Sequence, residues 1–559
     1  MNISSLSSHP KIRLQKFAAG ILSSGLLLTA LHAQTVQRVG TIWYIMMENR
    51  NFTENEASGG AQIYGSQAAP YINSLITPGN PNAAQTSWCT AYHNVLAVSS
   101  GGGPSIHPSE PNYIWMEAGS NLGITNDNDP YGTGLSVNTM HTFMGNNPAY
   151  TGQNLCGLIQ SAGLTWRAYS EGTNQLSTTS TNANLGGTPT ATAAAESIWT
   201  VPLASFSGTN AAYTNPYNGS HQWNFATKHT GSLFFAATNG TSSLTVANTA
   251  TTNPEAAYYS PLPDLAADLT AGTCAQYNVI TPDQFNDMHT ALTGGFTYNG
   301  THYTGDLAQI AQGDNFLSIV VPLIMASPQY QNNGVIVIWT DETEGSNQND
   351  FRHTLMEIVI SPLAKGNAYA STLNYTHSSD LNTMQKVFQV VANTETGYLN
   401  DAANPSNPTA AGLAGTVSAL TATAPIAGQS ATPPSGYGTG QAYDLSDLFK
   451  PGVIPTSIPV VTVSPSGFVL NRRTNTYAQT VIVTNKLSVA TTTPTYLEVG
   501  NLPSGATLVN AAGTAGNGKP YVLGAAAGLA PGASATVTLQ FTATGTLTDL
   551  LNVTTNGTP

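Results

Sequence analysis

Two long apolar runs dominate the first two thirds of the chain, and each ends in acidic residues. Residues 39–47 (VGTIWYIMM) and 334–340 (GVIVIWT) are almost continuously apolar, as strands buried on both faces of a parallel sheet are. Glu48 follows the first run, and Asp341 and Glu342 follow the second. Ligands of open α/β sheets gather at the carboxyl ends of strands, so these carboxylates are candidate metal ligands. For Glu48, a capped turn after a core strand is an equal alternative.

Shorter runs continue the alternation of strands and helices between these two and beyond the second. Strands are predicted at residues 163–169, 277–282 and 355–360, and helices at 156–160, from Asp314 onward, and from about 378 to 391. In the last helix, Ser378 or Ser379 is the expected cap. Such an alternation predicts an α/β fold, a doubly wound α/β/α sandwich.

The pattern changes after residue 450, where short β-type runs are separated by turn residues. The runs lie at 460–463, 479–484, 495–499, 535–541 and 551–554. This spacing predicts an immunoglobulin-like β-sandwich. Because the module carries no candidate catalytic group, a stabilising or spacer role is favoured over binding to a surface or polymer. The predicted domains are a signal peptide (1–33), a catalytic domain (34–450) and the β-sandwich (451–559).

The N-terminus has the features of a signal peptide. Lys11, Arg13 and Lys16 precede an apolar run at residues 17–31, and Ala33 offers a small residue for cleavage. The run is too short and too often interrupted by serine for a spanning helix. No other stretch approaches the length of a membrane span, so we expect no transmembrane segment and a secreted or periplasmic mature protein.

The low charge restricts the classes of binding partner, and the cysteine content restricts the possible disulfides. Only 8% of the 559 residues are charged, and the formal net charge is −13. No basic patch is therefore available to neutralise phosphates, which argues against a nucleic-acid partner. Cys89, Cys156 and Cys274 are the three cysteines. A disulfide between two of them is possible in an oxidising compartment, but the sequence does not choose the pair.

Ser109 stands at a predicted helix start. Pro111 suits the first helical turn, because its ring fixes a helical φ and its missing N–H has no partner there. Ser109 would then lie at or next to the N-cap, at the positive end of the helix dipole, where a phosphoryl group binds well. The alternative is that Ser109 only caps the helix. The polar loop at residues 123–127 is predicted to fold back over this helix.

Further histidines and carboxylates follow other predicted strands. Asp287 and His289 lie just beyond the strand at 277–282, and their mixed oxygen and nitrogen donors suit a divalent cation. Lys228 and His229 place a cation beside a histidine, although His229 alone fits a structural histidine better.

Five segments, in order, resemble the phosphoesterase family, which includes secreted acid phosphatases and bacterial phospholipases C. The segments are 46–52 (MMENRNF), 107–113 (HPSEPNY), 280–289 (ITP followed by NDMH), 341–342 (DE) and 375–379 (YTHSS). Together they span roughly residues 39 to 392. One such motif is weak, whereas five in sequence are specific.

The resemblance implies a fold of the alkaline-phosphatase-like type with Ser109 as nucleophile. On this basis we assign catalytic roles to Ser109, His107, His289 and His377, substrate contacts to Asn49, Asn112, Lys228, His229 and His353, and metal contacts to Glu48, Ser109, Asp287, Asp341 and Glu342. A divalent metal cation is the implied cofactor.

The chain departs from the wider superfamily at two metal positions. Asp341–Glu342 stands where an Asp–His pair is usual, and Glu48–Asn49 replaces the first-strand aspartate. Fewer nitrogens and more oxygens favour harder cations over zinc. The identity and number of the metals stay open.

The predicted function is a secreted, metal-dependent phosphoesterase that hydrolyses phosphate monoesters through a phosphoserine, as an acid phosphatase does. A phospholipase C acting on phospholipid head groups is the alternative within enzymes. The alternative of another class is a non-catalytic cell-surface binding protein built on a phosphoesterase scaffold. The expected partner is thus a small phosphate ester or a phospholipid.

Overall fold

The structure is a computed structural model of the 559-residue chain. It describes residues 38–53, 61–95, 107–122, 124, 126–130, 153–173, 201–202, 205–240, 254–344, 353–394, 396–403, 444–455, 457–458, 461–487, 489–491, 494–500, 502–515, 518–544, 547 and 552–556. The predicted signal peptide lies outside these residues.

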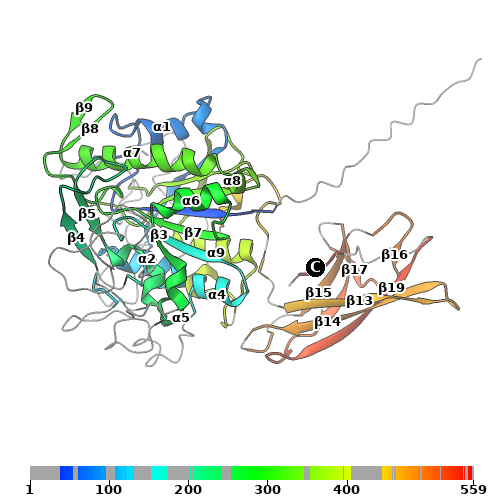
Figure 1. The fold of residues 1–559 in the computed structure, drawn as a ribbon. Coiled ribbons are helices and arrows are strands. Elements are labelled where there is room, and N and C mark those ends of the chain that lie inside the picture. The colour runs from blue at the N-terminus through cyan, green and yellow to red at the C-terminus, as the bar shows by residue number, and fades with distance from the viewer. Residues whose placement is uncertain are drawn as a thin grey trace, which may run out of the picture. The chain divides into compact units, whose positions relative to one another are not determined.

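An eight-stranded mixed sheet forms the centre of the first part of the chain (Figure 1). Its order is β12 (Tyr369–Tyr375), β2 (Thr86–Tyr92), β11 (Glu357–Ile360), β10 (Val335–Thr340), β1 (Ile42–Met47), β7 (Tyr277–Thr281), β3 (Trp166–Ser170) and β6 (Tyr259–Pro261). The two strands predicted from the longest apolar runs, β1 and β10, are parallel neighbours near its middle. The strand β11 runs antiparallel to both of its neighbours.

The side chains of β1 alternate between two buried clusters, which shows that the sheet is covered on both faces. Ile42, Tyr44 and Met46 belong to one buried cluster, and Trp43, Ile45 and Met47 belong to the other. The first cluster contains residues of α2 (Glu110–Ala118), α4 (Leu155–Ser161) and α9 (His377–Phe388), and the second those of α1 (Pro70–Leu75), α6 (Asp264–Ala271), α7 (Gly305–Met325) and α8 (Pro328–Gln331). Figure 1 shows α6 and α7 on one side of the sheet and α2 and α9 on the other. The predicted α/β class with helices on both faces is confirmed.

Two helix starts differ from the prediction. Helix α7 begins at Gly305, so Asp314 lies in its middle, where its carboxylate accepts the backbone N–H groups of Tyr71 (2.9 Å) and Ile72 (2.7 Å). Helix α9 is capped by Thr376 in a capping box with Ser379, and not by Ser378 or Ser379. In α7 a distant backbone claims the side chain of Asp314. In α9 the hydroxyl of Ser378 instead accepts the indole N–H of Trp115 at 2.8 Å, and Ser379 is the N3 partner of Thr376 in the capping box.

Helix α7 also corrects the expectation that nothing else approaches the length of a membrane span. Among the described residues it is long and apolar enough to cross one by length and composition alone, with 61% of the apolar window buried. Its buried side chains, among them Ile310, Phe316 and Ile324, pack against the sheet. It is therefore accounted for as a core helix.

Two other expectations concern the chain's covalent and domain organisation. The cysteines Cys89, Cys156 and Cys274 are all buried and free, so the disulfide that the sequence left open does not form. Val453 and Ile454 belong to the same buried cluster as α2 and α9. The core of the α/β part thus continues beyond residue 450, where the domain boundary was predicted.

The described residues from Val461 onward form an all-β module. One sheet contains β13 (Val461–Asn471), β14 (Thr476–Asn485), β19 (Ser534–Thr542) and β16 (Thr507–Leu508), and the other β17 (Gly513–Thr514), β18 (Pro520–Ala525), β15 (Thr495–Gly500) and β20 (Asn552–Asn556). Val481 and Phe541 from the first sheet share one buried cluster with Leu497 and Val522 from the second, so the two sheets enclose a common core. The strands β16, β17 and β18 were not predicted.

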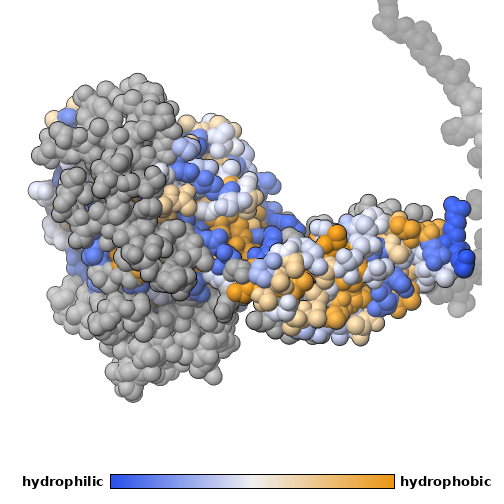
Figure 2. Space-filling view, turned by 90° about the horizontal axis from the view of Figure 1, so that it is seen from below, coloured by the Kyte–Doolittle hydropathy of each residue, from blue (hydrophilic) through white to orange (hydrophobic). Residues whose placement is uncertain are grey.

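The surface of this β-module carries apolar side chains among polar ones (Figure 2). Its exposed large apolar residues are Val469, Leu470, Ile482, Val509 and Leu523. Scattered exposure of this kind is ordinary for protein surfaces and does not by itself indicate a binding site.

Candidate active site

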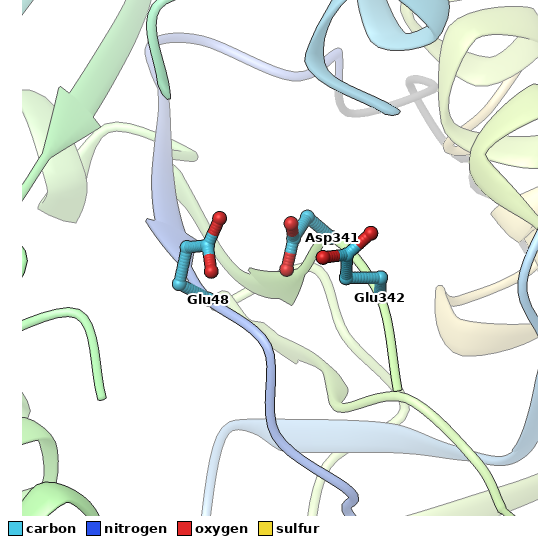
Figure 3. Close-up of side chains that lie close together, drawn as sticks. All are labelled: Glu48, Asp341 and Glu342. Carbon is cyan, nitrogen blue, oxygen red and sulfur yellow. The ribbon is translucent and has the colours of Figure 1, made fainter. Parts of the chain in front are cut away.

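The register of two parallel strands brings three carboxylates together. Met47 of β1 is paired with Thr340 of β10, so the next residues, Glu48 and Asp341, leave the sheet side by side, with Glu342 following. One carboxylate oxygen from each of these three residues lies within 4.8 Å of the other two, and Figure 3 shows the three side chains at this edge. All three side chains are buried. A buried cluster of like charges requires a compensating positive charge.

The donor atoms of this cluster fit a hard divalent cation. Oδ2 of Asp341 and Oδ1 of Asn49 are buried and have no hydrogen-bond partner among the described residues. The other oxygen of Asp341 accepts the backbone N–H of Asn49 at 2.7 Å. Burial, together with the charges of Glu48 and Glu342, raises the pKa of Asp341 well above its usual value. An all-oxygen set of this kind suits Ca²⁺, Mg²⁺ or Mn²⁺.

Ser109 is oriented toward this cluster and not toward its own helix. It is the N-cap residue of α2, as predicted, but its side chain makes no capping hydrogen bond. Its hydroxyl instead donates to Oε1 of Glu342 at 3.0 Å. A serine oxygen therefore lies beside the carboxylate cluster, which is where a metal-activated nucleophile belongs.

Glu342 is held by three donors from the same segment. Nδ1 of His107 lies 2.6 Å from Oε1, which also accepts from Ser109, and Nδ2 of Asn112 donates to Oε2 at 2.9 Å. Burial raises the pKa of Glu342 to about 7, although these bonds and the charge of His107 act in the opposite direction. Burial lowers the pKa of His107, but its contact with Glu342 raises it overall. His107 and Asn112 thus position Glu342.

His229 forms a charged bridge between two acidic residues. Its Nε2 lies 2.8 Å from Oε1 of Glu48 and its Nδ1 lies 3.1 Å from Oδ2 of Asp287, while Tyr113 stacks on the ring at 5.0 Å between centroids. Burial lowers the pKa of His229, but the charges of both carboxylates raise it to about 9. Burial raises the pKa of Glu48, yet His229, His289 and Lys228 lower it below its usual value. The histidine is therefore an imidazolium at neutral pH.

Asp287 and His289 lie at the same edge, beyond β7. The backbone N–H of His289 donates to Oδ1 of Asp287 at 2.8 Å, and Nε2 of His289 lies 3.9 Å from Oε2 of Glu48. About a third of the His289 side chain, 31%, is exposed. It is thus placed to meet a substrate, whereas the carboxylate of Asp287 faces His229.

His377 contacts the carboxylate cluster through the backbone carbonyl of Asp341. Its Nε2–H donates to the carbonyl oxygen of Asp341 at 2.6 Å, and its Nδ1 accepts from the indole N–H of Trp339 at 3.2 Å. Burial lowers the pKa of His377 to about 3, so the ring stays neutral. Both ring nitrogens are engaged by the protein itself, and His377 therefore positions Asp341. The predicted catalytic role stays a prediction.

The two remaining candidates are His353 and Lys228. His353 is buried next to Thr354, whose hydroxyl is 2.6 Å from that of Thr53. Lys228 is paired with Asp127, its Nζ 2.9 Å from Oδ2. Asp127 belongs to the polar loop that was predicted to fold back over the Ser109 helix, and its Oδ1 accepts the N–H of Glu110 in that helix at 3.1 Å.

The sequence reasoning assigned no role in the site to three residues that shape it. Trp339 was read only as part of a buried strand, Tyr113 only as part of an apolar helix start, and Asp127 only as part of a loop. Their contacts join segments far apart in the chain, as with Lys228 and Asp127, which are separated by 101 positions. The one available signal was charge, since Asp127 is among few acidic residues in the chain.

The profile of the Phosphoesterase family matches residues 103–391, slightly more than half of the chain. No curated protein matches this chain. Among solved structures, a protein in the alkaline phosphatase superfamily from Vibrio parahaemolyticus is 9% identical, with 80% of this chain and 77% of that chain covered and a TM-score of 0.32. The sulfatase PsFucS1 from Pseudoalteromonas sp. is 11% identical, with coverage of 65% and 71% and a TM-score of 0.35. At these TM-scores neither adds to what the site itself shows.

Proposed function

Since the chain belongs to the phosphoesterase family, we propose that it hydrolyses phosphate monoesters through a phosphoserine intermediate on Ser109. One observation carries this proposal. The Ser109 hydroxyl, although placed at a helix N-cap, donates to Glu342 of the carboxylate cluster at 3.0 Å. A serine used only as a cap would bond its own helix instead.

Glu48, Asp341 and Glu342 would hold the divalent cation. When bound, the cation acts as a Lewis acid that lowers the pKa of the serine hydroxyl and neutralises charge on the phosphoryl oxygens. Asn49 contributes its unpartnered amide oxygen beside this position. His377 fixes the backbone of Asp341, and His107 and Asn112 fix the carboxylate of Glu342. These contacts keep the acidic oxygens converging before any ligand arrives.

The chemistry assigned to the side chains follows from their positions. Oγ of Ser109 forms the new bond to phosphorus, the bond to the ester oxygen breaks, and the serine proton passes toward Glu342. His289, partly exposed and 3.9 Å from Glu48, is the group that protonates the departing alcohol. In the second half-reaction the same histidine takes a proton from the water that attacks phosphorus, the bond from phosphorus to Oγ of Ser109 breaks, and Glu342 returns its proton to that oxygen. The imidazolium of His229 stabilises the negative charge that gathers beside Glu48.

A chromogenic phosphomonoester with matched variants tests this function. The wild type should turn over p-nitrophenyl phosphate, lose that activity with a chelator and regain it with a divalent cation. Ser109→Ala should lose nearly all turnover yet stay folded, because deleting a hydroxyl at an N-cap costs about 0.5–2 kcal/mol. Substantial turnover by that variant would remove Ser109 as the nucleophile. A folded wild type that is inert toward monoesters and choline phosphodiesters alike would favour a binding protein.

Two further expectations belong to the same proposal. Export rests on the basic and apolar N-terminal segment at residues 11–31. The C-terminal module has two antiparallel sheets around one core, which is compatible with an immunoglobulin-like spacer.

A further inference from the structure

The first three residues of α2 after Ser109 offer no backbone N–H to a substrate anion. The N–H of Glu110 donates to Oδ1 of Asp127 at 3.1 Å, Pro111 has no N–H, and the N–H of Asn112 donates to the carbonyl of Ser109 at 2.9 Å. Helix N-termini usually bind phosphate through such amides. Besides a bound cation, positively charged side chains are therefore the groups that can serve the phosphoryl oxygens here.

Lys228 is a cation placed to supply that charge. It precedes His229, whose ring touches Glu48, and the two residues share one short helical turn, η3 (Thr227–His229). Only 14% of the Lys228 side chain is exposed. Burial lowers its pKa, but the charges of Glu48, Asp127 and Asp341 raise it overall, so the ammonium stays protonated. Its electrostatic partners are thus the residues of the candidate site.

The ammonium is held in place by Asp127. One carboxylate oxygen of Asp127 accepts the amide that directly follows Ser109, and the other lies 2.9 Å from Nζ of Lys228. The same aspartate therefore ties the cation to the helix that carries the nucleophile. A side chain that bonds both partners at once fixes the distance between them.

A second tether joins the same two segments. Both carboxylate oxygens of Asp129 accept from Ser205, one from its hydroxyl at 2.7 Å and one from its N–H at 2.9 Å. The hydroxyl of Ser205 in turn accepts the N–H of Thr227 at 3.0 Å, next to Lys228. The loop that carries Asp127 and Asp129 therefore contacts the η3 turn at two points, so Lys228 is not a freely moving surface lysine.

We propose that Lys228 selects the dianionic head of a phosphomonoester, and that Asp127 is the positioning residue that holds its ammonium beside Ser109. This rests on the proposed function and names its substrate class. A monoester carries one more negative charge near neutral pH than a diester, and a fixed cation favours the form with more charge. The same cation repels the trimethylammonium of a choline ester. The site therefore favours monoesters over phospholipid head groups of the choline type.

The experiment measures kcat and KM for three substrates of different charge. These are p-nitrophenyl phosphate, bis-p-nitrophenyl phosphate and p-nitrophenyl phosphorylcholine. The variants are Lys228→Met, which keeps length without charge, Lys228→Arg, which keeps the charge, and Asp127→Asn. The matched control is Lys365→Met, which breaks the Lys365–Asp447 ion pair after β11. Because β11 is antiparallel to β10, that pair lies at the end of the strands opposite to the carboxylate cluster.

Lys228→Met should lower kcat/KM for the monoester about 10- to 100-fold, the loss expected for one hydrogen bond to a charged group. Both diesters should change by less than about threefold, since they lack the second charge. Lys228→Arg should restore much of the monoester rate. Asp127→Asn should lower kcat more than it raises KM, because attraction persists while alignment is lost. Lys365→Met should match the wild type.

Equal losses on all three substrates, or no loss on any, would overturn the role of Lys228. A variant Asp127→Asn with wild-type kinetics would overturn the role of Asp127. Binding of inorganic phosphate, followed by isothermal titration calorimetry, separates this proposal from the function itself. If the wild type hydrolyses no ester but Lys228→Met still binds phosphate at least about tenfold more weakly, the proposed function fails while anion recognition by Lys228 stands. Unchanged phosphate binding would reject both.

Discussion

Replacing Asp341 by asparagine should raise the unfolding free energy of the cation-free protein and remove most of the stabilisation that a divalent cation gives the wild type. The substitution removes a negative charge but keeps the shape and the acceptor for the Asn49 N–H, which lies 2.7 Å from Oδ1. Two unit charges at the cluster's limit of 4.8 Å repel by about 3.5 kcal/mol at an effective dielectric of ~20. Protonation of Asp341 relieves part of that repulsion. We therefore expect Asp341→Asn to raise the cation-free unfolding free energy by about 1–3 kcal/mol.

A divalent cation offsets this difference in stability. A cation at 100 times its dissociation constant stabilises the folded wild type by about 2.7 kcal/mol. The variant should gain little, since it has lost one of three anionic ligands. Urea unfolding at pH 8, with excess chelator and then with a titrated cation, measures both free energies. Turnover of the monoester should fall to background in the same variant.

Two outcomes would refute this reasoning. If the cation-free variant is less stable than the wild type, the three carboxylates do not repel one another and Asp341 serves mainly as a hydrogen-bond acceptor. If a cation stabilises both proteins equally, it binds elsewhere. Lys365→Met, far from the cluster, should show the wild-type gain with the cation and serves as the control.

Two further predictions concern stability. Burial raises the pKa of Asp314 to about 6. Since this folded-state value exceeds the unfolded one, its stabilising contribution is complete below about pH 4 and is lost as the pH rises through about 6. Relative to Asp314→Asn, the wild type should thus lose about 3 kcal/mol between pH 3 and pH 7. A chain ending at residue 458 should keep full activity on small monoesters, whereas one ending at Phe449 loses the buried Val453 and Ile454, each worth about 1.5–3 kcal/mol.

Urea midpoints across pH test the first of these, and a difference between wild type and variant that does not change with pH would contradict it. Circular dichroism and monoester kinetics on both truncated chains test the second. A folded but inactive chain ending at residue 458 would mean that the β-module contributes to the active site.

The local chemistry of this protein can be read from its sequence. The apolar runs that became β1 and β10 identify two central strands, because only strands covered on both faces are apolar throughout. Their ends locate Glu48, Asp341 and Glu342, since the carboxyl ends of parallel strands share one edge. Pro111 likewise locates the start of α2 and Ser109 with it. Each inference depends on neighbours within a few positions of one another.

The partners of those side chains were decided only by the tertiary structure. Periodicity cannot show that a ring N–H of His377 donates to the backbone carbonyl of Asp341. Nor can it show that Asp127 binds both the N–H of Glu110, next to Ser109, and the ammonium of Lys228. The same holds for Asp314, a polar residue in the middle of a helix because a distant backbone needs its carboxylate. Hydrogen bonds act over about 3 Å between groups that the chain separates by tens to hundreds of positions, so packing alone determines which donor meets which acceptor.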